Sequence, residues 1–314
     1  MSARLVWLVL VAAAVVAAVA RAAAGDDDGR LSTDELVADA AARGLDAELA
    51  RRVAPFRLYA WCGHCFWIAK WSLVSFVTYL GLLFVAANVL RPRSVPAARA
   101  RDWDNTFCSF VHAAVTATGI VTLAVTEPRL FAHPARFFDT SPLLGIIQAH
   151  TTGYFIYDLA TFGFYVSRTW PMKLHHVMII VINFWSYHGC CYMPALSITL
   201  FAEVNSTFMH TRQLLKLAQC EDTFLYKVQV WLLAGTYLPF RVAPFWYGTY
   251  ISFVYRHDVQ TNLQWYTGFY GSLAMNALNI WWLVLYTRND VGQRVLGTGD
   301  GAKKRAARKA VAAK

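Results

Sequence analysis

The feature that most constrains this chain is a series of long apolar segments separated by short polar loops. Each segment can cross about 30 Å of hydrocarbon as an α-helix, whose backbone polar groups bond to one another within the helix. Hydrophobic residues make up 57% of the 314 residues and charged ones only 15%. The sequence therefore predicts an all-α membrane protein with about seven transmembrane helices. These run over residues 66–90, 107–126, 143–165, 174–193, 195–213, 228–253 and 267–286.

The two ends of the chain differ from the spans. Arg4 precedes an apolar stretch and then small residues, a pattern typical of a targeting signal. We interpret residues 1–24 as a signal peptide, or as a signal anchor if they are not cleaved. Residues 25–60 are then a lumenal polar segment with a short amphipathic helix, residues 66–288 the transmembrane domain and residues 289–314 a basic tail.

The net charge of +10 is gathered in alternate loops and in the tail. Basic residues close to the ends of spans favour the cytosolic side of a membrane, so we expect a lumenal N-terminus and a cytosolic C-terminus. A charge distributed in this way indicates membrane topology, and we expect no nucleic-acid partner. The basic residues of these loops are Arg91, Arg93, Arg99, Arg101, Arg168, Lys173, Lys216 and Lys227.

Near the N-terminus, Asp26, Asp28 and Glu35 have the spacing of an EF-hand calcium loop. Its first position is Ala24, which offers no carboxylate. We therefore expect neither a bound metal nor a cofactor.

Six cysteines occur in the chain, and two of them form a redox-like motif, Trp61-Cys62-Gly63-His64-Cys65. A thioredoxin-type centre needs a separate domain around it, whereas here a membrane span begins at once. The motif therefore does not predict an oxidoreductase. Cys62 and Cys65 share the predicted lumenal side with Cys190 and Cys191, so a structural disulfide between the two pairs is a candidate.

Polar residues inside the spans are the most informative, because each is costly in hydrocarbon unless it is paired or lines a cavity. Six successive spans contribute at least one. They indicate an intramembrane polar cavity entered from the cytosolic side. The alternative is a hydrogen-bond network that only holds helices together, for example through an ion pair of Asp158 or Glu203 with Arg241. The residues are His112, Asp158, His175, His176, Glu203, Asn205, Arg241, Asn276 and Asn279.

Several of these residues lie in short motifs whose order is similar to that of the TLC domain. The motifs are Cys108-Ser109-Phe110-Val111-His112, Gly153-Tyr154-Phe155-Ile156-Tyr157-Asp158-Leu159, Lys173-Leu174-His175-His176, Glu203-Val204-Asn205-Ser206, Phe240-Arg241 and Asn279-Ile280-Trp281-Trp282. The family contains ceramide synthases, translocation-associated membrane proteins and lipid-regulating proteins. The resemblance implies residence in the endoplasmic reticulum.

In ceramide synthases, paired histidines, a downstream His-Asp and a second Asp carry acyl transfer. Here His175 and His176 match the pair, while Ala202 and Glu203 stand at the His-Asp position and Ser206 replaces the second Asp. The resemblance is therefore closer to members that regulate membrane lipids.

The leading hypothesis is a membrane protein of lipid homeostasis that binds or regulates acyl lipids or sphingolipids. The first alternative is an acyl-CoA-dependent N-acyltransferase in which His175 or His176 is base or nucleophile, Glu203 orients it and Asp158 supports the pair. The second alternative is a transporter or receptor. The expected substrate-binding residues are His112, Arg168, Lys173, Asn205, Arg241, Asn276 and Asn279.

Overall fold

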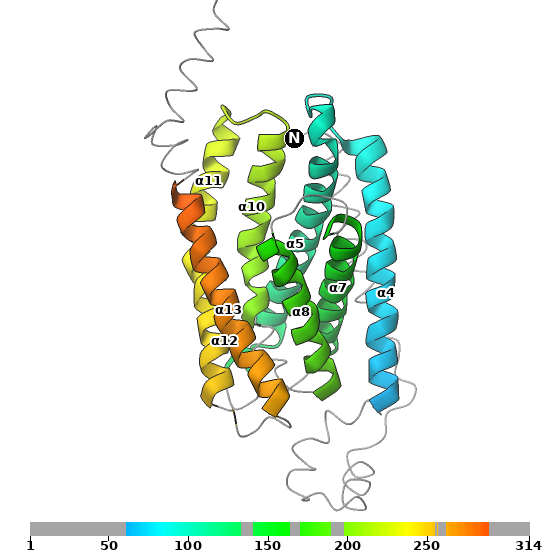
Figure 1. Cartoon of the computed structure of the whole chain (residues 1–314), viewed down its shortest axis with the longest axis vertical. Helices are drawn as coiled ribbons and strands as arrows, with labels where there is room; N and C mark the ends of the chain where they lie inside the picture. Colours follow the sequence, from blue (N-terminus) through cyan, green and yellow to red (C-terminus); the bar gives the residue numbers. More distant parts are fainter. Residues whose placement is uncertain are drawn as a thin grey trace, which may run out of the picture.

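The computed structural model describes residues 61–132, 141–163, 170–189, 198–254, 256 and 262–288. Within these ranges the chain forms helices joined by short connections and no strand (Figure 1). Several sequence-based predictions lie outside these ranges: the signal segment, the lumenal segment with its calcium-like motif, the basic tail, Arg168, Cys190 and Cys191. Cys62 and Cys65 lie on a described helix, but their side chains are outside the described part.

The helices follow the predicted spans with shifted ends. They are α4 (Trp61–Val85), η1 (Ala86–Leu90), η2 (Ala97–Arg99), α5 (Ala100–Thr126), α6 (Arg129–Ala132), α7 (Pro142–Asp158), η3 (Leu159–Gly163), α8 (Trp170–Gly189), α10 (Ala202–Leu217), α11 (Phe224–Tyr237), η4 (Leu238–Val242), α12 (Ala243–Val254) and α13 (Asn262–Tyr286). Among the described residues, two stretches are long and apolar enough to cross a membrane, Lys70–Leu90 and Ala97–Thr126.

Local sequence signals explain several helix ends. Ser141 caps α7 by accepting a hydrogen bond from the Leu144 N–H, and Pro142 occupies the first turn, where no backbone donor is needed. Thr223 caps α11 in the same way, through the Tyr226 N–H. The end of α10 is closed by Gln219, whose φ of 62° lets the Cys220 N–H reach back to the Leu215 carbonyl.

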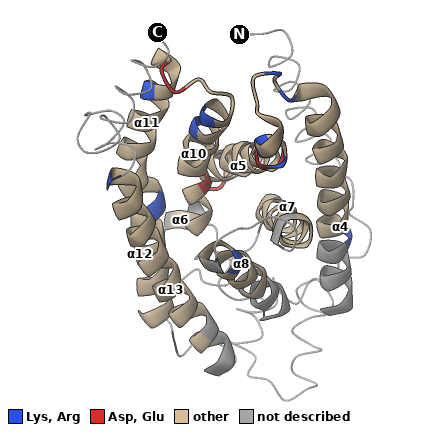
Figure 2. Cartoon of the chain, turned by 45° about the horizontal axis from the view of Figure 1, so that its top comes forward, with Lys and Arg blue, Asp and Glu red and all other residues tan. Residues whose placement is uncertain are grey.

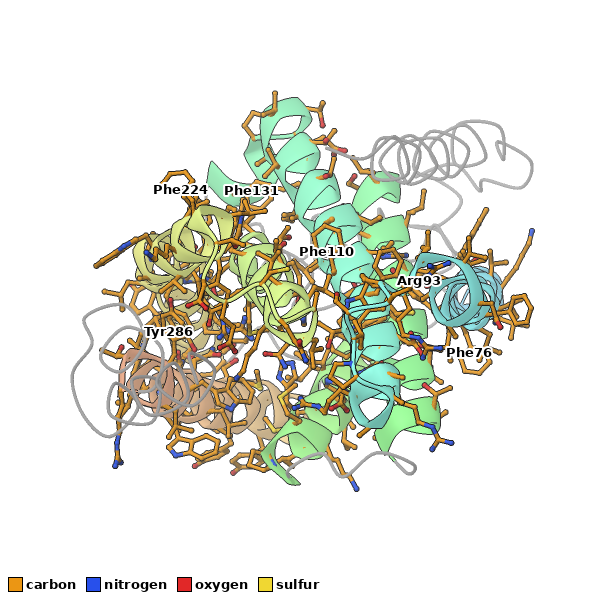
Figure 3. All side chains as sticks on the ribbon, turned by 90° about the horizontal axis from the view of Figure 1, so that it is seen from above. Phe76, Arg93, Phe110, Phe131, Phe224 and Tyr286 are labelled. Carbon is orange, nitrogen blue, oxygen red and sulfur yellow. The ribbon has the colours of Figure 1, made fainter. Side chains whose placement is uncertain are left out.

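Six helical stretches pack as successive neighbours and close a ring (Figure 2). The order around the ring is α5, α10, the stretch formed by α11, η4 and α12, then α13, α8, α7 and back to α5. α4 packs on the outside of this ring, mainly against α7. In the view from above, Phe76 of α4 and Arg93 of the connection to α5 lie on one side, and Phe224 and Tyr286 lie on the other (Figure 3).

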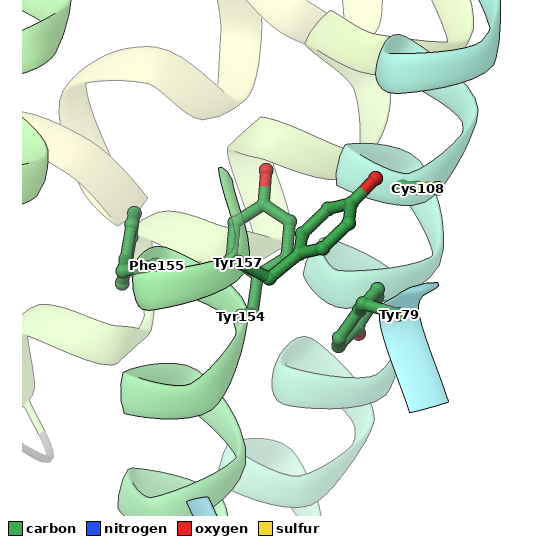
Figure 4. Packing of buried hydrophobic residues seen from close by; sticks show 5 residues of the cluster. All are labelled: Tyr79, Cys108, Tyr154, Phe155 and Tyr157. Atoms are coloured by element: carbon green, nitrogen blue, oxygen red, sulfur yellow. The ribbon is translucent and has the colours of Figure 1, made fainter. Parts of the chain in front are cut away.

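The contact between α4 and the ring is rich in aromatic side chains. Tyr79 of α4 packs against Cys108 of α5 and Tyr154, Phe155 and Tyr157 of α7, and all five are buried (Figure 4). The opposite face of α4 is apolar and exposed, including Leu73, Val77 and Phe84 at 62%, 57% and 69%. An apolar outer face around a polar interior is the arrangement expected of a protein surrounded by lipid.

Candidate functional site

The centre of the candidate site is a short histidine–carboxylate contact between the end of α7 and the first two turns of α8. The Nδ1 atom of His176 lies 2.8 Å from Oδ2 of Asp158, and the two side chains are only 6% and 1% exposed. A carboxylate at Nδ1 holds the imidazole in one orientation and favours the form with hydrogen on Nδ1. Nε2 is then the nitrogen that can accept a proton.

His175 is buried beside this pair. Its ring centroid lies 5.3 Å from that of His176, and its Nδ1 is 3.2 Å from the sulfur of Met275 on α13. The ring of Phe155 contacts both histidines, at 5.7 and 5.0 Å between centroids. The Trp282 ring lies edge-on to His175 at 5.7 Å. Aromatic contacts from two neighbouring helices therefore hold both imidazoles in place.

Arg241 lies in η4, the π-helical turn between α11 and α12, and is 6% exposed. Its Nε donates to Oδ1 of Asn279 at 3.0 Å, and one terminal nitrogen donates to Oγ of Ser206 at 2.9 Å. The guanidinium also lies over the rings of Tyr237 and Trp282, at 5.9 and 5.7 Å. Trp282 thus contacts both Arg241 and His175, so the two polar groups form one constellation.

Glu203 lies next to this constellation and does not contact the histidines through any hydrogen bond in the described part of the chain. Its carboxylate lies close enough to Arg241 to interact with it electrostatically, without a direct contact. The carboxylate that holds a histidine is thus Asp158, not Glu203. Arg241 itself bonds to neutral groups, and the alternative ion pair of Arg241 with Asp158 or Glu203 is not formed in this structure.

Two of the asparagines join helices. Asn205 donates to the Leu233 carbonyl and to Oγ1 of Thr236, at 3.0 and 2.8 Å. Asn276 donates to Oγ1 of Thr249 at 3.0 Å. Asn279 takes part in the Arg241 network instead. These contacts fasten α10 to α11 and α12 to α13.

His112 belongs to a second group of rings, on the side of α4. It stacks on Tyr154 with 3.9 Å between centroids, and His150 lies 5.3 Å away. Nε2 of His150 in turn lies within hydrogen-bond distance of the Tyr79 hydroxyl, at 3.2 Å. The Phe155 ring contacts both His112 and His176, at 5.5 and 5.0 Å between centroids, so this group adjoins the site. His150 was missed, although its place in an apolar span is the signal that identified the other polar residues.

A sequence profile of the TLC domain matches residues 102–288. The chain belongs to the TLC-domain family. It is similar to TLC domain-containing protein 2 of Danio rerio, with 28% identity over 182 residues, 57% of this chain and 72% of that protein. It is also similar to TLC domain-containing protein 2 of Homo sapiens, 26% over 188 residues (59% and 70%), and to TLC domain-containing protein 1 of Mus musculus, 26% over 182 residues (55% and 72%).

The matched TLC domain contains the whole ring of helices, whereas α4 precedes it. Every described member of the site is therefore part of the family's own domain. Lys173 stands half-buried at the start of α8, one turn before the histidines.

No cluster of three or more metal-ligating side chains occurs among the described residues. Cys108 and Cys220, the cysteines whose side chains are described, are not in disulfides.

Proposed function

We propose that this TLC-domain protein binds an acyl lipid at the polar interior of its helix ring and thereby controls membrane lipid composition. The observation that carries the proposal is the His176–Asp158 pair, 2.8 Å long and almost fully buried among apolar helices. Such a pair is costly to bury. A function that needs a polar group inside the membrane would explain why this pair is buried there.

The ligand class follows from the two surfaces of the ring. Outside, exposed side chains such as Trp246, Tyr250 and Val284 are suited to hydrocarbon. Inside, histidine, arginine and asparagine offer hydrogen bonds. A molecule with an acyl chain and a polar head matches both environments, so the head would lie near His176 and the chain against the apolar walls. Sphingolipids and other acyl lipids share this form.

The proposal includes an arrangement in the membrane. Seven helices would cross it around the polar cavity, with the N-terminus lumenal and the C-terminus cytosolic, and the endoplasmic reticulum is the proposed location. In its support, the described loops from α4 to α5 and from α10 to α11 lie at one end of the molecule, where basic residues gather (Figures 1 and 2). Basic residues favour the cytosolic side.

The second candidate is an acyl-CoA-dependent N-acyltransferase, which the orientation of His176 favours. With Asp158 at Nδ1, Nε2 can accept the proton of an amine that attacks an acyl thioester. The C–N bond forms as the C–S bond breaks, and the proton passes from Nε2 to the departing CoA sulfur. Asp158 would stabilise the imidazolium between the two transfers.

One experiment separates the two candidates. Membranes from cells that lack their own acyl-CoA-dependent N-acyltransferases of this family would receive isotope-labelled acyl-CoA, and the lipids would be identified by mass spectrometry. The wild type would be compared with His176→Ala and Asp158→Asn. Asp104→Asn is the matched control, because Asp104 is another buried carboxylate and bonds to Arg91 at 3.0 Å, away from the site.

A labelled lipid made by the wild type and Asp104→Asn but lost in the other two variants would identify an acyltransferase. An altered lipid profile without a labelled product, again lost in those two variants, would identify a lipid-binding regulator. If the wild type and His176→Ala produce the same lipids in both measurements, the proposal is wrong.

A further inference from the structure

Arg241 is the one residue of the constellation whose charge is not matched by a contacting partner in the described structure. No carboxylate oxygen of a described residue lies within 4.0 Å of its guanidinium nitrogens. Two of its five N–H donors bond to neutral oxygens, of Asn279 and Ser206. A buried guanidinium satisfied only by neutral groups is unstable relative to one that meets an anion.

The other groups around Arg241 do not supply an anion that contacts the guanidinium. Glu203 interacts with it electrostatically, but its carboxylate does not come within 4.0 Å of the guanidinium nitrogens. Tyr237 and Trp282 face the guanidinium with their rings, which contributes a weaker cation–π attraction. The remaining N–H donors lie at the edge of the guanidinium plane, and such a planar fork fits carboxylate or phosphate oxygens in a bidentate manner.

A neighbouring amide adds a second contact point. The Nδ2 atom of Asn279 is buried and has no hydrogen-bond partner within the described chain, while Oδ1 of the same side chain accepts from Arg241. Asn279 is fully buried. A buried amide donor next to a guanidinium that no carboxylate contacts can bind an oxygen anion.

We propose that Arg241, with Asn279, receives an anionic oxygen group, a carboxylate or a phosphate, on the head of the acyl lipid. This inference rests on the proposed function and names the chemical class of its ligand. His175 is linked to Arg241 through Trp282, so the anionic group would be held next to the paired histidines.

The test uses the full-length protein in maltoside micelles and three probes with the same chain: oleate, oleoyl lysophosphatidate and the uncharged oleyl alcohol. Binding would be measured for the wild type, Arg241→Gln, Arg241→Lys and Arg212→Gln. Arg212 is the matched control, since it is a partly buried guanidinium on ring helix α10 that packs on Tyr286 and bonds to the Tyr226 hydroxyl.

We expect at least one anionic probe to bind the wild type more tightly than oleyl alcohol. Arg241→Gln should weaken that probe by about 10- to 100-fold, the value of charge-assisted hydrogen bonds. It should leave oleyl alcohol within about twofold, which also shows that the variant is folded. Arg241→Lys keeps the charge but not the planar fork, so its affinity for the anionic probe should lie between those of the wild type and Arg241→Gln. Arg212→Gln should bind the probe as tightly as the wild type. Preference for oleate or for lysophosphatidate identifies the anion as carboxylate or phosphate.

Three outcomes would overturn the inference. In the first, oleyl alcohol binds the wild type as tightly as both anionic probes do. This comparison uses the wild type alone, so it does not depend on the folding of any variant. In the second, Arg241→Gln loses the same fraction of its affinity for all three probes. In the third, Arg212→Gln loses as much affinity for the anionic probe as Arg241→Gln does. In these cases the proposed lipid site would stand. If none of the three probes binds the wild type, the proposed function itself is contradicted.

Discussion

At the scale of single residues, Gly153 allows α7 to approach the outer helix α4 closely. A Cβ atom at this position would lie 2.6 Å from Cβ of Ser75 and nearer still to the carbonyl oxygen of Ser72. Because that backbone oxygen cannot move aside like a side chain, Gly153→Ala should destabilise the protein by about 1–3 kcal/mol. The melting temperature of the purified protein in detergent would measure the loss.

Gly81 provides the matched control on α4. A Cβ atom there meets nothing within 4 Å. Gly81→Ala should leave the melting temperature unchanged or raise it, since alanine stabilises a helix by roughly 0.5–1 kcal/mol over glycine. A similar loss in both variants would contradict the close crossing of α4 and α7.

Asn205 carries a second residue-scale prediction, because Asn205-Ser206-Thr207 has the form of a glycosylation acceptor. The side chain is fully buried and donates both of its bonds to α11. We therefore expect no sugar on it, and glycosidase treatment should leave the mass of the protein unchanged. A shift in the wild type that is absent in Asn205→Gln would show that this part of α10 reaches the lumen.

The sequence predicts which residues belong to the candidate site better than it predicts which of them contact one another. The cost of polar groups in hydrocarbon predicts that His175, His176, Asp158 and Arg241 must each find a polar partner. Their partners could not be chosen in this way, because His176 meets Asp158 only when α7 and α8 pack in one particular register. Glu203 was selected as the orienting carboxylate from its place in a motif, and motif position does not report direction around a helix.

At the scale of elements, the sequence predicts the helices more closely than their irregularities. The span expected at 228–253 is a helical stretch from Phe224 to Val254, interrupted by the π turn η4. The absent N–H groups of Pro239 and Pro244 show that the α-helical bonding must break there. They do not show how it is restored, which here is a bond from the Ala243 N–H to the Leu238 carbonyl. The π turn η3 contains no proline, so the sequence gives no signal for it.

The π turn η4 yields an element-scale prediction, since it sets the direction in which Arg241 points. Replacing both prolines with alanine restores the two missing donors and allows a continuous α-helix. Loss of the extra residue in the turn would rotate one half of the stretch by about 100° relative to the other. Arg241 would then leave Asn279 and Ser206, and Pro239→Ala/Pro244→Ala should bind the anionic probe as weakly as Arg241→Gln.

The controls for this experiment are the single variants Pro239→Ala and Pro244→Ala and the uncharged probe, oleyl alcohol. Oleyl alcohol should still bind the double variant if the helix has only rotated locally. Unchanged binding of the anionic probe in the double variant would mean that Arg241 is oriented by its partners and not by the π turn.

At the scale of the whole molecule, closure of the ring explains why one chain can combine an apolar exterior with buried polar side chains. Each ring helix contributes polar groups to its inner side, and neighbouring helices satisfy most of them. Among its described side chains, α4 makes no hydrogen bond to His176, Asp158 or Arg241, and its Tyr79 hydroxyl reaches only His150 of the adjoining ring group. It covers α7 with aromatic rings, so its contribution is to stability.

The last prediction concerns the direction of the whole ring in the membrane. Arg93 is exposed in the connection between α4 and α5, and Arg256 is exposed just after α12, at the opposite end of the molecule (Figure 1). The proposed orientation places Arg93 in the cytosol and Arg256 in the lumen. In sealed microsomes, a membrane-impermeant thiol reagent should therefore label Arg93→Cys beyond the wild-type background and reach Arg256→Cys only after detergent is added. Labelling in the reverse order would invert the topology and move the site's entrance to the lumenal side, because Asp158 and His176 lie at the helix ends nearer to Arg93. Labelling of both variants in sealed vesicles would instead mean that the helices between them do not cross the membrane an odd number of times.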